Sequence, residues 1–310
     1  MDELSPTPVP RFSNATLVLA AIFCFALVAI LSVSAYAVLE QKKAERASTL
    51  AALSSSTEKI VVHSESFADL SLGARAVYVL DLSTGAILYQ KNANVQLPLA
   101  SLTKLMTALV ASDLISSDTS VMFDGQQWDR DVLINLTLVV SSNEGADALA
   151  LAGEKVSEKK FLDEMNFQAR SLGMSETFYV NPTGLDLTGT QGGSYGSAHD
   201  MAQLMAFIVT HNPELIQATR FPLYMTRSLE GVLITVRNTN PEVSRIPGIL
   251  GSKTGFTDLA NGNLIIAFDR GLAQPVVIAV LGSSQEGRFR DVETLVERTF
   301  AYYHQPLTTP

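Results

Sequence analysis

The chain has 310 residues, enough for one large domain or two small ones. Its formal charge of −9 argues against nucleic acid as a partner, because phosphate binding needs a basic surface. The single cysteine, Cys24, excludes an internal disulfide framework, and the four histidines are too scattered to suggest metal ligands, so we expect no metal and no other cofactor.

An apolar segment follows a short N-terminal tail (residues 1–14). Residues 15–39 form an uncharged run of 25 residues, long enough to cross a bilayer as a helix. A cleaved signal peptide is the alternative, because Ala35-Tyr-Ala37 resembles a cleavage site. The apolar core of a signal peptide is usually only about 7–15 residues long. We therefore predict a single transmembrane anchor.

The charges beside this segment bear on which side of the membrane the rest of the chain lies. Lys42, Lys43 and Arg46 follow it directly. Taken alone, the positive-inside rule would place the rest of the chain in the cytoplasm.

Residues 40–70 are polar and rich in small side chains, which is typical of a juxtamembrane linker. We expect the folded domain to occupy residues 71–305. It begins with a predicted hairpin, in which Ala76–Leu80 and Ala86–Tyr89 are strands and Ser83–Gly85 is the turn.

Helical periodicity then dominates from Ser101 to about Gly173, and a further helix is predicted from Ser197 to Val209. The last part of the chain predicts three β-branched strands and a closing helix: Gly231–Arg237, Gly262–Asp269, Gln274–Leu281 and Arg288–Tyr303. This order predicts an α+β fold whose antiparallel sheet is completed by distant parts of the chain.

The first of three short motifs that suggest acyl transfer is Ser101-Leu-Thr-Lys104. A spacing of three places both side chains on one helical face, so the amine can reach the hydroxyl. The same spacing occurs in charged surroundings at 56–59 and 157–160, where ordinary surface residues are the better interpretation. The apolar residues after Ser101 favour a buried Lys104. We expect burial and the charge of Lys253 to keep that amine neutral, as a general base requires.

The second motif is Ser141-Ser-Asn143, which interrupts two apolar stretches. It is either a plain turn between helices or a turn whose hydroxyl and amide relay a proton and hold a substrate.

The third motif is Lys253-Thr254-Gly255, at the front of a predicted strand region. An ordinary lysine on an edge strand is the alternative. In a catalytic site, Lys253 and the Thr254 hydroxyl would bind a substrate carboxylate. Gly255 would allow the backbone to approach the nucleophile.

A fourth pattern, Gly192-Gly-Ser194-Tyr-Gly196, matches the nucleophile elbow of another hydrolase class, and His199-Asp200 follows it. That motif should follow an apolar strand, whereas here it follows a polar loop. We do not expect Ser194 to be catalytic.

Longer segments around these motifs resemble the penicillin-binding D-alanyl-D-alanine carboxypeptidases, the low-molecular-weight serine DD-peptidases of peptidase family S11. The resemblance covers roughly residues 70–303 and is carried by 98–109, 178–186, 193–198 and 251–258. It implies a fold similar to serine β-lactamases and DD-peptidases, with an antiparallel sheet flanked by helices and a helical subdomain.

The resemblance also implies catalytic roles. Ser101 would be the acylated nucleophile, Lys104 its base, and Ser141 the group that passes a proton to the departing D-alanine. Hydrolysis of the acyl-enzyme would complete the cycle without a metal.

Substrate-binding roles follow in the same way. Asn143 would hold the peptide, and Lys253 and Thr254 would bind its terminal carboxylate beside Gly255. The backbone N–H groups of the nucleophile and of Phe256 would form the oxyanion hole.

This resemblance implies an enzyme that removes the terminal D-alanine from peptidoglycan stem peptides, with β-lactam antibiotics as covalent inhibitors. A DD-endopeptidase of cross-linked peptidoglycan and a non-catalytic sensor of muropeptides or penicillin are the alternatives. A β-lactamase is disfavoured, because no Glu-x-x-Leu-Asn motif is present. Such a function requires a catalytic domain outside the cytoplasmic membrane, held by a single N-terminal pass. We therefore expect this orientation, although the positive-inside rule alone indicates the opposite one.

Three positions depart from the family pattern: Ser142 stands where glycine is usual, Glu144 where aspartate is usual, and Phe256 where histidine is frequent. We expect any effect to concern substrate preference or deacylation. The chain ends soon after the last predicted helix, so we also expect no additional C-terminal domain or C-terminal anchor.

Overall fold

The computed structural model describes residues 65–157 and 160–304. The predicted tail, membrane anchor and nearly all of the linker lie outside these residues. Within the two described ranges, no helix is long and apolar enough to cross a membrane.

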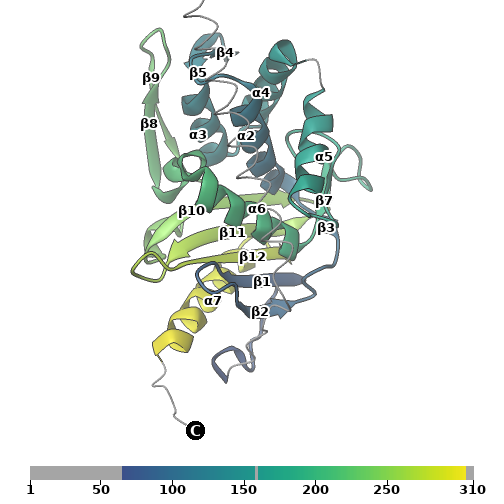
Figure 1. Ribbon diagram of the computed structural model, residues 1–310, viewed down its shortest axis with the longest axis vertical. Coiled ribbons are helices and arrows are strands. Elements are labelled where there is room, and N and C mark those ends of the chain that lie inside the picture. The colour runs from purple at the N-terminus through teal and green to yellow at the C-terminus, as the bar shows by residue number, and fades with distance from the viewer. Residues whose placement is uncertain (1–64, 158–159, 305–310) are drawn as a thin grey trace, which may run out of the picture. The chain divides into compact units, whose positions relative to one another are not determined.

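The central element is a five-stranded antiparallel sheet with the order β10-β11-β12-β1-β2 (Figure 1). Its strands are β1 (Ala76–Asp81), β2 (Ile87–Lys91), β10 (Ile249–Thr257), β11 (Asn261–Asp269) and β12 (Pro275–Ser283). The first hairpin pairs with the last strand, so that Val77 lies opposite Val280. The prediction of an α+β fold with a sheet completed by distant segments is confirmed.

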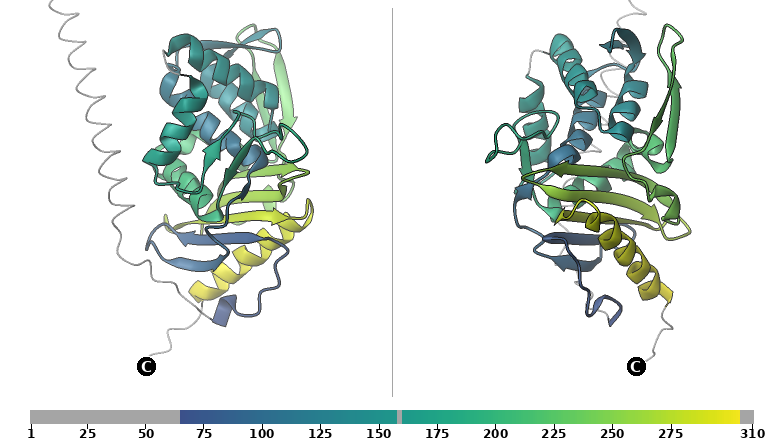
Figure 2. Two further views of the ribbon diagram at one scale, coloured as in Figure 1. Left: turned by 90° about the vertical axis from the view of Figure 1, so that its right-hand side faces the viewer. Right: turned by 180° about the vertical axis from the view of Figure 1, so that it is seen from behind.

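Helices cover both faces of this sheet. Helix α6 (Ala198–His211) packs on one face and α7 (Gly287–His304) on the other (Figure 2). Because both faces are covered, β12 is buried almost throughout rather than at alternate positions. The core between the sheet and α7 is aliphatic and aromatic, and includes Val79, Ile266, Phe268, Ile278 and Leu295.

The remaining helices gather beyond the edge strand β10 (Figure 1). They are α2 (Thr103–Leu114), α3 (Arg130–Val140), α4 (Asn143–Val156) and α5 (Phe161–Ser171). Helices dominate this region as predicted, but a hairpin that the sequence analysis does not predict interrupts them. It consists of β4 (Ser120–Phe123) and β5 (Gln126–Asp129). Its turn is Asp124-Gly125, and both residues have positive φ, as tight hairpin turns require.

The predicted strand Gly231–Arg237 does not belong to the main sheet. It forms β9 (Leu233–Arg237), which pairs only with β8 (Leu223–Arg227) in a separate hairpin. Alternate residues of both strands are exposed, so this hairpin cannot be enclosed between two helical layers as the main sheet is. Strand β10 takes the edge position of the main sheet instead, and the Lys-Thr-Gly motif lies within it.

Candidate active site

Ser101 lies in a single 3₁₀ turn, η2 (Ala100–Leu102), immediately before α2. A small antiparallel sheet fixes the start of this turn, where β3 (Leu97–Pro98) pairs with β7 (Ser194–Gly196). The residue before Ser101, Ala100, has φ of 49°, in the left-handed region that a side chain makes costly. The turn therefore holds the serine in a constrained backbone geometry, directly before the helix that carries Lys104.

Lys104 is fully buried and points back to this turn. Its Nζ lies 3.0 Å from Ser101 Oγ, 2.7 Å from Asn143 Oδ1 and 2.6 Å from the carbonyl oxygen of Thr183. Burial lowers the pKa of Lys104 to about 8, although the carboxylates of Asp147 and Glu144 partly oppose the shift. The expected burial of this lysine is confirmed. The expectation of a neutral amine is only partly met: a pKa of about 8 leaves Lys104 neutral in a minority of molecules at pH 7, and burial rather than the charge of Lys253 lowers it.

The Ser141–Asn143 segment is the connection between α3 and α4. Ser141 ends α3 with φ of 59°, and the Ser142 side chain caps α4, with its Oγ accepting a hydrogen bond from Gly145 N at 2.9 Å. This geometry places the Ser141 hydroxyl and the Asn143 amide on the side of the lysines. The interpretation as a turn between helices is correct, and the same turn presents two polar groups to the site.

Strand β10 forms the opposite wall. Lys253 is buried, and its Nζ donates to Ser141 Oγ at 2.8 Å and to the carbonyl oxygen of Thr254 at 2.9 Å. Burial, followed by the positive charges of Lys104 and Arg288, holds the pKa of Lys253 well below its usual value. Two lysine–serine pairs, each joined by a hydrogen bond, therefore share one site.

Gly255 marks the closest approach of β10 to the nucleophile turn. A Cβ atom placed on it would lie 2.9 Å from the carbonyl oxygen of Leu99 and 3.3 Å from the backbone nitrogen of Ser101. These distances leave no room for a side chain without moving one of the two backbones. The adjacent Phe256 is 42% exposed, so unlike Lys253 and Thr254 it is open to solvent.

A third wall comes from residues 181–186, which lie in a segment that carries the family resemblance but to which the sequence assigns no role. Besides the Thr183 carbonyl that accepts from Lys104, this segment contains Gly184, where a Cβ would lie only 1.9 Å from the Ala100 carbonyl oxygen. Asp186 then accepts a hydrogen bond from Thr257 Oγ1 at 3.0 Å, which ties the segment to β10.

Two further residues outside the motifs hold these walls in place. The Asn263 amide nitrogen donates to the carbonyl oxygens of Pro98 and Leu99, both at 3.0 Å, and so fastens the nucleophile loop to the sheet. From α7, Arg288 donates to the Gly255 carbonyl oxygen at 2.6 Å. Both contacts are long-range, and no local sequence pattern announces them.

The alternative nucleophile is not placed for chemistry. Ser194 is fully buried in β7, where its hydroxyl shares a short hydrogen bond with Thr103 Oγ1. Asp200 accepts from the backbone nitrogen of Glu176 and the hydroxyl of Thr177, both at 2.8 Å, so it closes a structural link. The expectation that Ser194 is not catalytic agrees with this burial.

Between these walls lies a serine hydroxyl next to an amine of lowered pKa, with a second lysine–hydroxyl pair beside it and an edge strand along it. An amine of this kind can accept a proton from a hydroxyl near neutral pH. A buried lysine beside an edge strand can bind an anionic peptide end laid along that strand. No group of three or more His, Cys, Asp or Glu side chains suited to a metal occurs in the part of the chain that the structure describes.

Comparisons of this chain with known proteins agree on one family. The family model described as D-alanyl-D-alanine carboxypeptidase matches residues 62–121 and 112–285. The D-alanyl-D-alanine carboxypeptidase DacB2 of Mycobacterium tuberculosis is 32% identical over 231 residues, which is 69% of this chain and 77% of that protein. A D-alanyl-D-alanine endopeptidase of Pseudomonas aeruginosa is 31% identical over 63% of this chain and 67% of its own length.

Among solved structures, the ampicillin-bound form of penicillin-binding protein D2 from Listeria monocytogenes is similar, with 32% identity and a TM-score of 0.64. The match covers 75% of this chain and 99% of the solved chain.

Proposed function

This chain belongs to the D-alanyl-D-alanine carboxypeptidase family, and on that premise we propose that Ser101 removes the terminal D-alanine from peptidoglycan stem peptides through an acyl-enzyme. The observation that carries the proposal is the hydrogen bond between Lys104 Nζ and Ser101 Oγ, at 3.0 Å, in a site where burial lowers the pKa of the lysine to about 8.

Acylation begins when neutral Lys104 accepts the Ser101 hydroxyl proton. The serine oxygen then attacks the carbonyl carbon of the penultimate D-alanine. Negative charge develops on the carbonyl oxygen, and the backbone N–H groups of Ser101 and Phe256 would stabilise it, each donor contributing roughly 3–4 kcal/mol. The close approach of β10 at Gly255 supports this arrangement, because it brings the two backbones to opposite sides of one narrow space.

The terminal carboxylate of the substrate is assigned to β10. Lys253 supplies the positive charge, since a bound carboxylate would restore the protonated form that burial disfavours. The hydroxyl of Thr254, now donating to Thr239 Oγ1 at 2.7 Å, can turn to the substrate. Asn143 holds the peptide amide from the other side.

The leaving D-alanine needs a proton on its nitrogen as the C–N bond breaks. We assign this step to Ser141, whose hydroxyl accepts a hydrogen bond from Lys253 Nζ at 2.8 Å and lies beside the Lys104–Ser101 pair. Ser141 gives its proton to that nitrogen and takes one from protonated Lys104, so the proton removed from Ser101 ends on the departing D-alanine. Water then hydrolyses the Ser101 ester with Lys104 again acting as base.

The test is release of free D-alanine from a peptidoglycan pentapeptide ending in D-Ala-D-Ala. We expect release by the wild-type chain and none by Ser101→Ala, with folding of both checked by circular dichroism. A folded wild-type chain that releases no D-alanine, but cleaves a cross-linked peptide dimer, would indicate the endopeptidase instead. The identity to the Pseudomonas endopeptidase makes that second substrate worth including.

We further propose that residues 15–39 anchor the enzyme and leave its catalytic domain outside the cytoplasmic membrane. The uncharged run of 25 residues supports the anchor, and the location of peptidoglycan supports the orientation against the basic residues that follow. We expect the full chain to remain with membranes in alkaline carbonate and to be digested by protease added to spheroplasts. Protection from that protease would contradict the orientation.

A further inference from the structure

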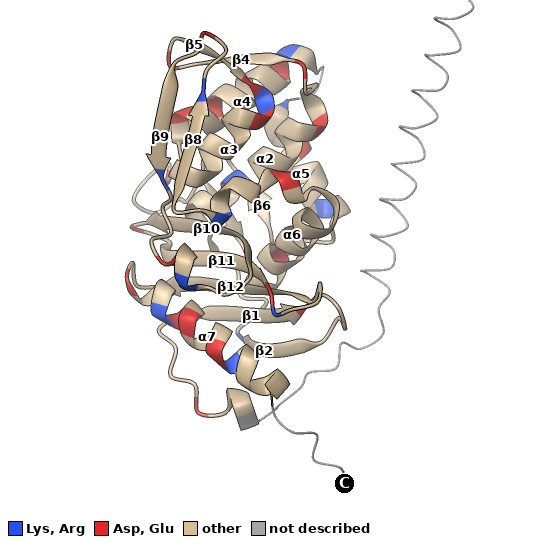
Figure 3. Ribbon diagram, turned by 90° about the vertical axis from the view of Figure 1, so that its left-hand side faces the viewer, with Lys and Arg blue, Asp and Glu red and all other residues tan. Residues whose placement is uncertain are grey.

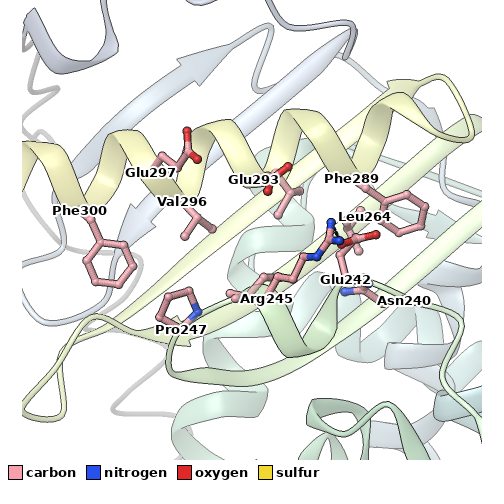
Figure 4. Close-up of a pocket in the computed structure, with 12 residues that line it drawn as sticks. Asn240, Glu242, Arg245, Pro247, Leu264, Phe289, Glu293, Val296, Glu297 and Phe300 are labelled. Atoms are coloured by element: carbon pink, nitrogen blue, oxygen red, sulfur yellow. Dashed lines mark hydrogen bonds and ion pairs between the residues drawn. The ribbon is translucent and has the colours of Figure 1, made fainter.

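A cavity of about 420 Å³ lies between α7 and the segment 240–247, which leads into β10 (Figure 4). This segment contains the 3₁₀ turn η5 (Val243–Arg245). The residues that line the cavity include none of those assigned to catalysis or substrate binding. It is therefore a separate feature, and its volume is within the range that accommodates a small organic molecule.

One wall of the cavity is apolar. Helix α7 contributes Val292, Val296 and the half-buried rings of Phe289 and Phe300, and β11 contributes Leu264 (Figure 4). Such a surface gains free energy when it covers the hydrocarbon part of a ligand. The wall thus favours an occupant with a ring or a short aliphatic body.

The rim of the cavity is acidic. Arg245 Nη1 pairs with Glu242 Oε2 at 2.7 Å, so these two charges largely cancel. Glu293 and Glu297 remain as exposed carboxylates that line the cavity. Helix α7 carries both acidic and basic residues (Figure 3), but its arginines, Arg288, Arg290 and Arg298, are not among the lining residues. The excess negative charge favours a cation over a neutral or anionic occupant.

Asn240 adds an unused hydrogen-bond donor. This side chain is only 1% exposed, and its Oδ1 accepts from the backbone nitrogen of Glu242, whereas its buried Nδ2 has no partner. A buried donor without an acceptor is unfavourable by about 1–3 kcal/mol. A ligand oxygen entering beside Asn240 would supply the missing acceptor.

Both walls are connected to the strand that carries the Lys-Thr-Gly motif. Thr239, which precedes Asn240, accepts the hydrogen bond of Thr254. Arg288, which precedes Phe289, donates to the Gly255 carbonyl oxygen. A change at the cavity walls is therefore one residue away from groups that position β10.

We propose that this cavity is a second ligand site, which binds a small amphipathic cation with a hydrogen-bond-accepting oxygen, and that its occupancy shifts β10 at Thr254 and Gly255. The inference goes beyond the proposed function, and the binding does not depend on catalysis.

Procaine and benzocaine form a matched pair of probes. Both carry an aromatic ring and an ester oxygen, but only procaine carries an ammonium group. The test is a titration of the ¹⁵N-labelled full chain, followed by amide chemical shifts. We expect saturable procaine binding, with shifts at residues 240–247 and in α7, together with shifts at Thr254 and Gly255.

Charge variants decide the chemistry of the site. Replacing both exposed carboxylates (Glu293→Gln with Glu297→Gln) should weaken procaine by about tenfold, the scale of two exposed ion pairs, and leave benzocaine unchanged. Glu154→Gln, which removes one exposed charge on α4, is the control and should alter neither ligand. Equal affinity of both probes in wild type, no saturable binding, or shifts confined to another surface would overturn the site. Saturation without shifts at Thr254 and Gly255 would overturn the link to β10.

Discussion

At the scale of single residues, the central feature is a buried lysine whose pKa is lowered. Lys104 has no exposed surface and makes contacts with a hydroxyl, an amide oxygen and a carbonyl oxygen. Burial favours the neutral amine, and the carboxylates of Asp147 and Glu144 favour the ammonium, so the pKa of about 8 is a balance between them. The pH dependence of acylation should report this balance.

We expect the second-order rate of acylation to rise with pH and to level off above about 8, because only neutral Lys104 can accept the Ser101 proton. Asp147→Asn removes a group that raises the pKa of Lys104, so the acidic limb should move to lower pH. Since Asp147 is exposed, solvent screening should keep this shift small. The measurement is acylation by a fluorescent penicillin from acid pH to well above pH 8, with Glu154→Gln as the control. A limb that moves to higher pH in Asp147→Asn would contradict this assignment.

Gly255 provides a second test at a single residue. Gly255→Ala places a methyl group 2.9 Å from the Leu99 carbonyl oxygen and 3.3 Å from Ser101 N, so β10 must move away from the nucleophile turn. We expect at least a tenfold loss of kcat/KM, since misplacement by about 1 Å can cost roughly 100-fold. Gly189→Ala, where a Cβ meets nothing within 4 Å, should keep full activity. Full activity in Gly255→Ala would show that the close approach has no catalytic importance.

At the scale of elements, the α3–α4 turn explains why Ser142 can replace the glycine that is usual in the family. Ser142 has φ of −63°, a conformation open to any residue, and its hydroxyl caps α4. The left-handed conformation falls on Ser141 instead, the residue whose hydroxyl contacts Lys253. A serine at position 142 therefore needs no left-handed backbone.

The capping of α4 by Ser142 should contribute to the stability of the fold. Ser142→Ala should lower the free energy of unfolding by about 1 kcal/mol, and Ser142→Gly by only a few tenths, because glycine leaves the N-terminus of the helix open to water. Urea denaturation followed by circular dichroism measures both. A Ser142→Ala variant as stable as wild type would mean that the cap does not contribute.

At the scale of the whole molecule, the sequence predicts much of the sheet and the identity of the site residues, but not their geometry. The N-terminal hairpin, β11, β12, α6 and α7 follow from local periodicity. The β4–β5 hairpin was missed although Asp124-Gly125 is a turn signal, because the flanking strands are only four residues long. The place of β9 outside the main sheet depends on its partners, which periodicity does not reveal.

Local sequence patterns do not reveal the contacts within the site either. Ser141 and Lys253 are 112 positions apart, and only the fold brings their side chains to 2.8 Å. The Thr183 carbonyl carries no sequence signature because every residue has one. Asn263 and Arg288 act on backbone groups of other elements, so they stand out only once the sheet and α7 are in place.

The most direct test of the whole account is to trap the acyl-enzyme. The chain is incubated with benzylpenicillin, its intact mass is measured, and the modified peptide is sequenced by mass spectrometry. We predict one added penicilloyl group on Ser101, no addition in Ser101→Ala, and acylation slowed by at least about 100-fold in Lys104→Met, the scale of general-base catalysis. An unmodified wild-type chain, or a label on any residue other than Ser101, would contradict the assignment of the nucleophile.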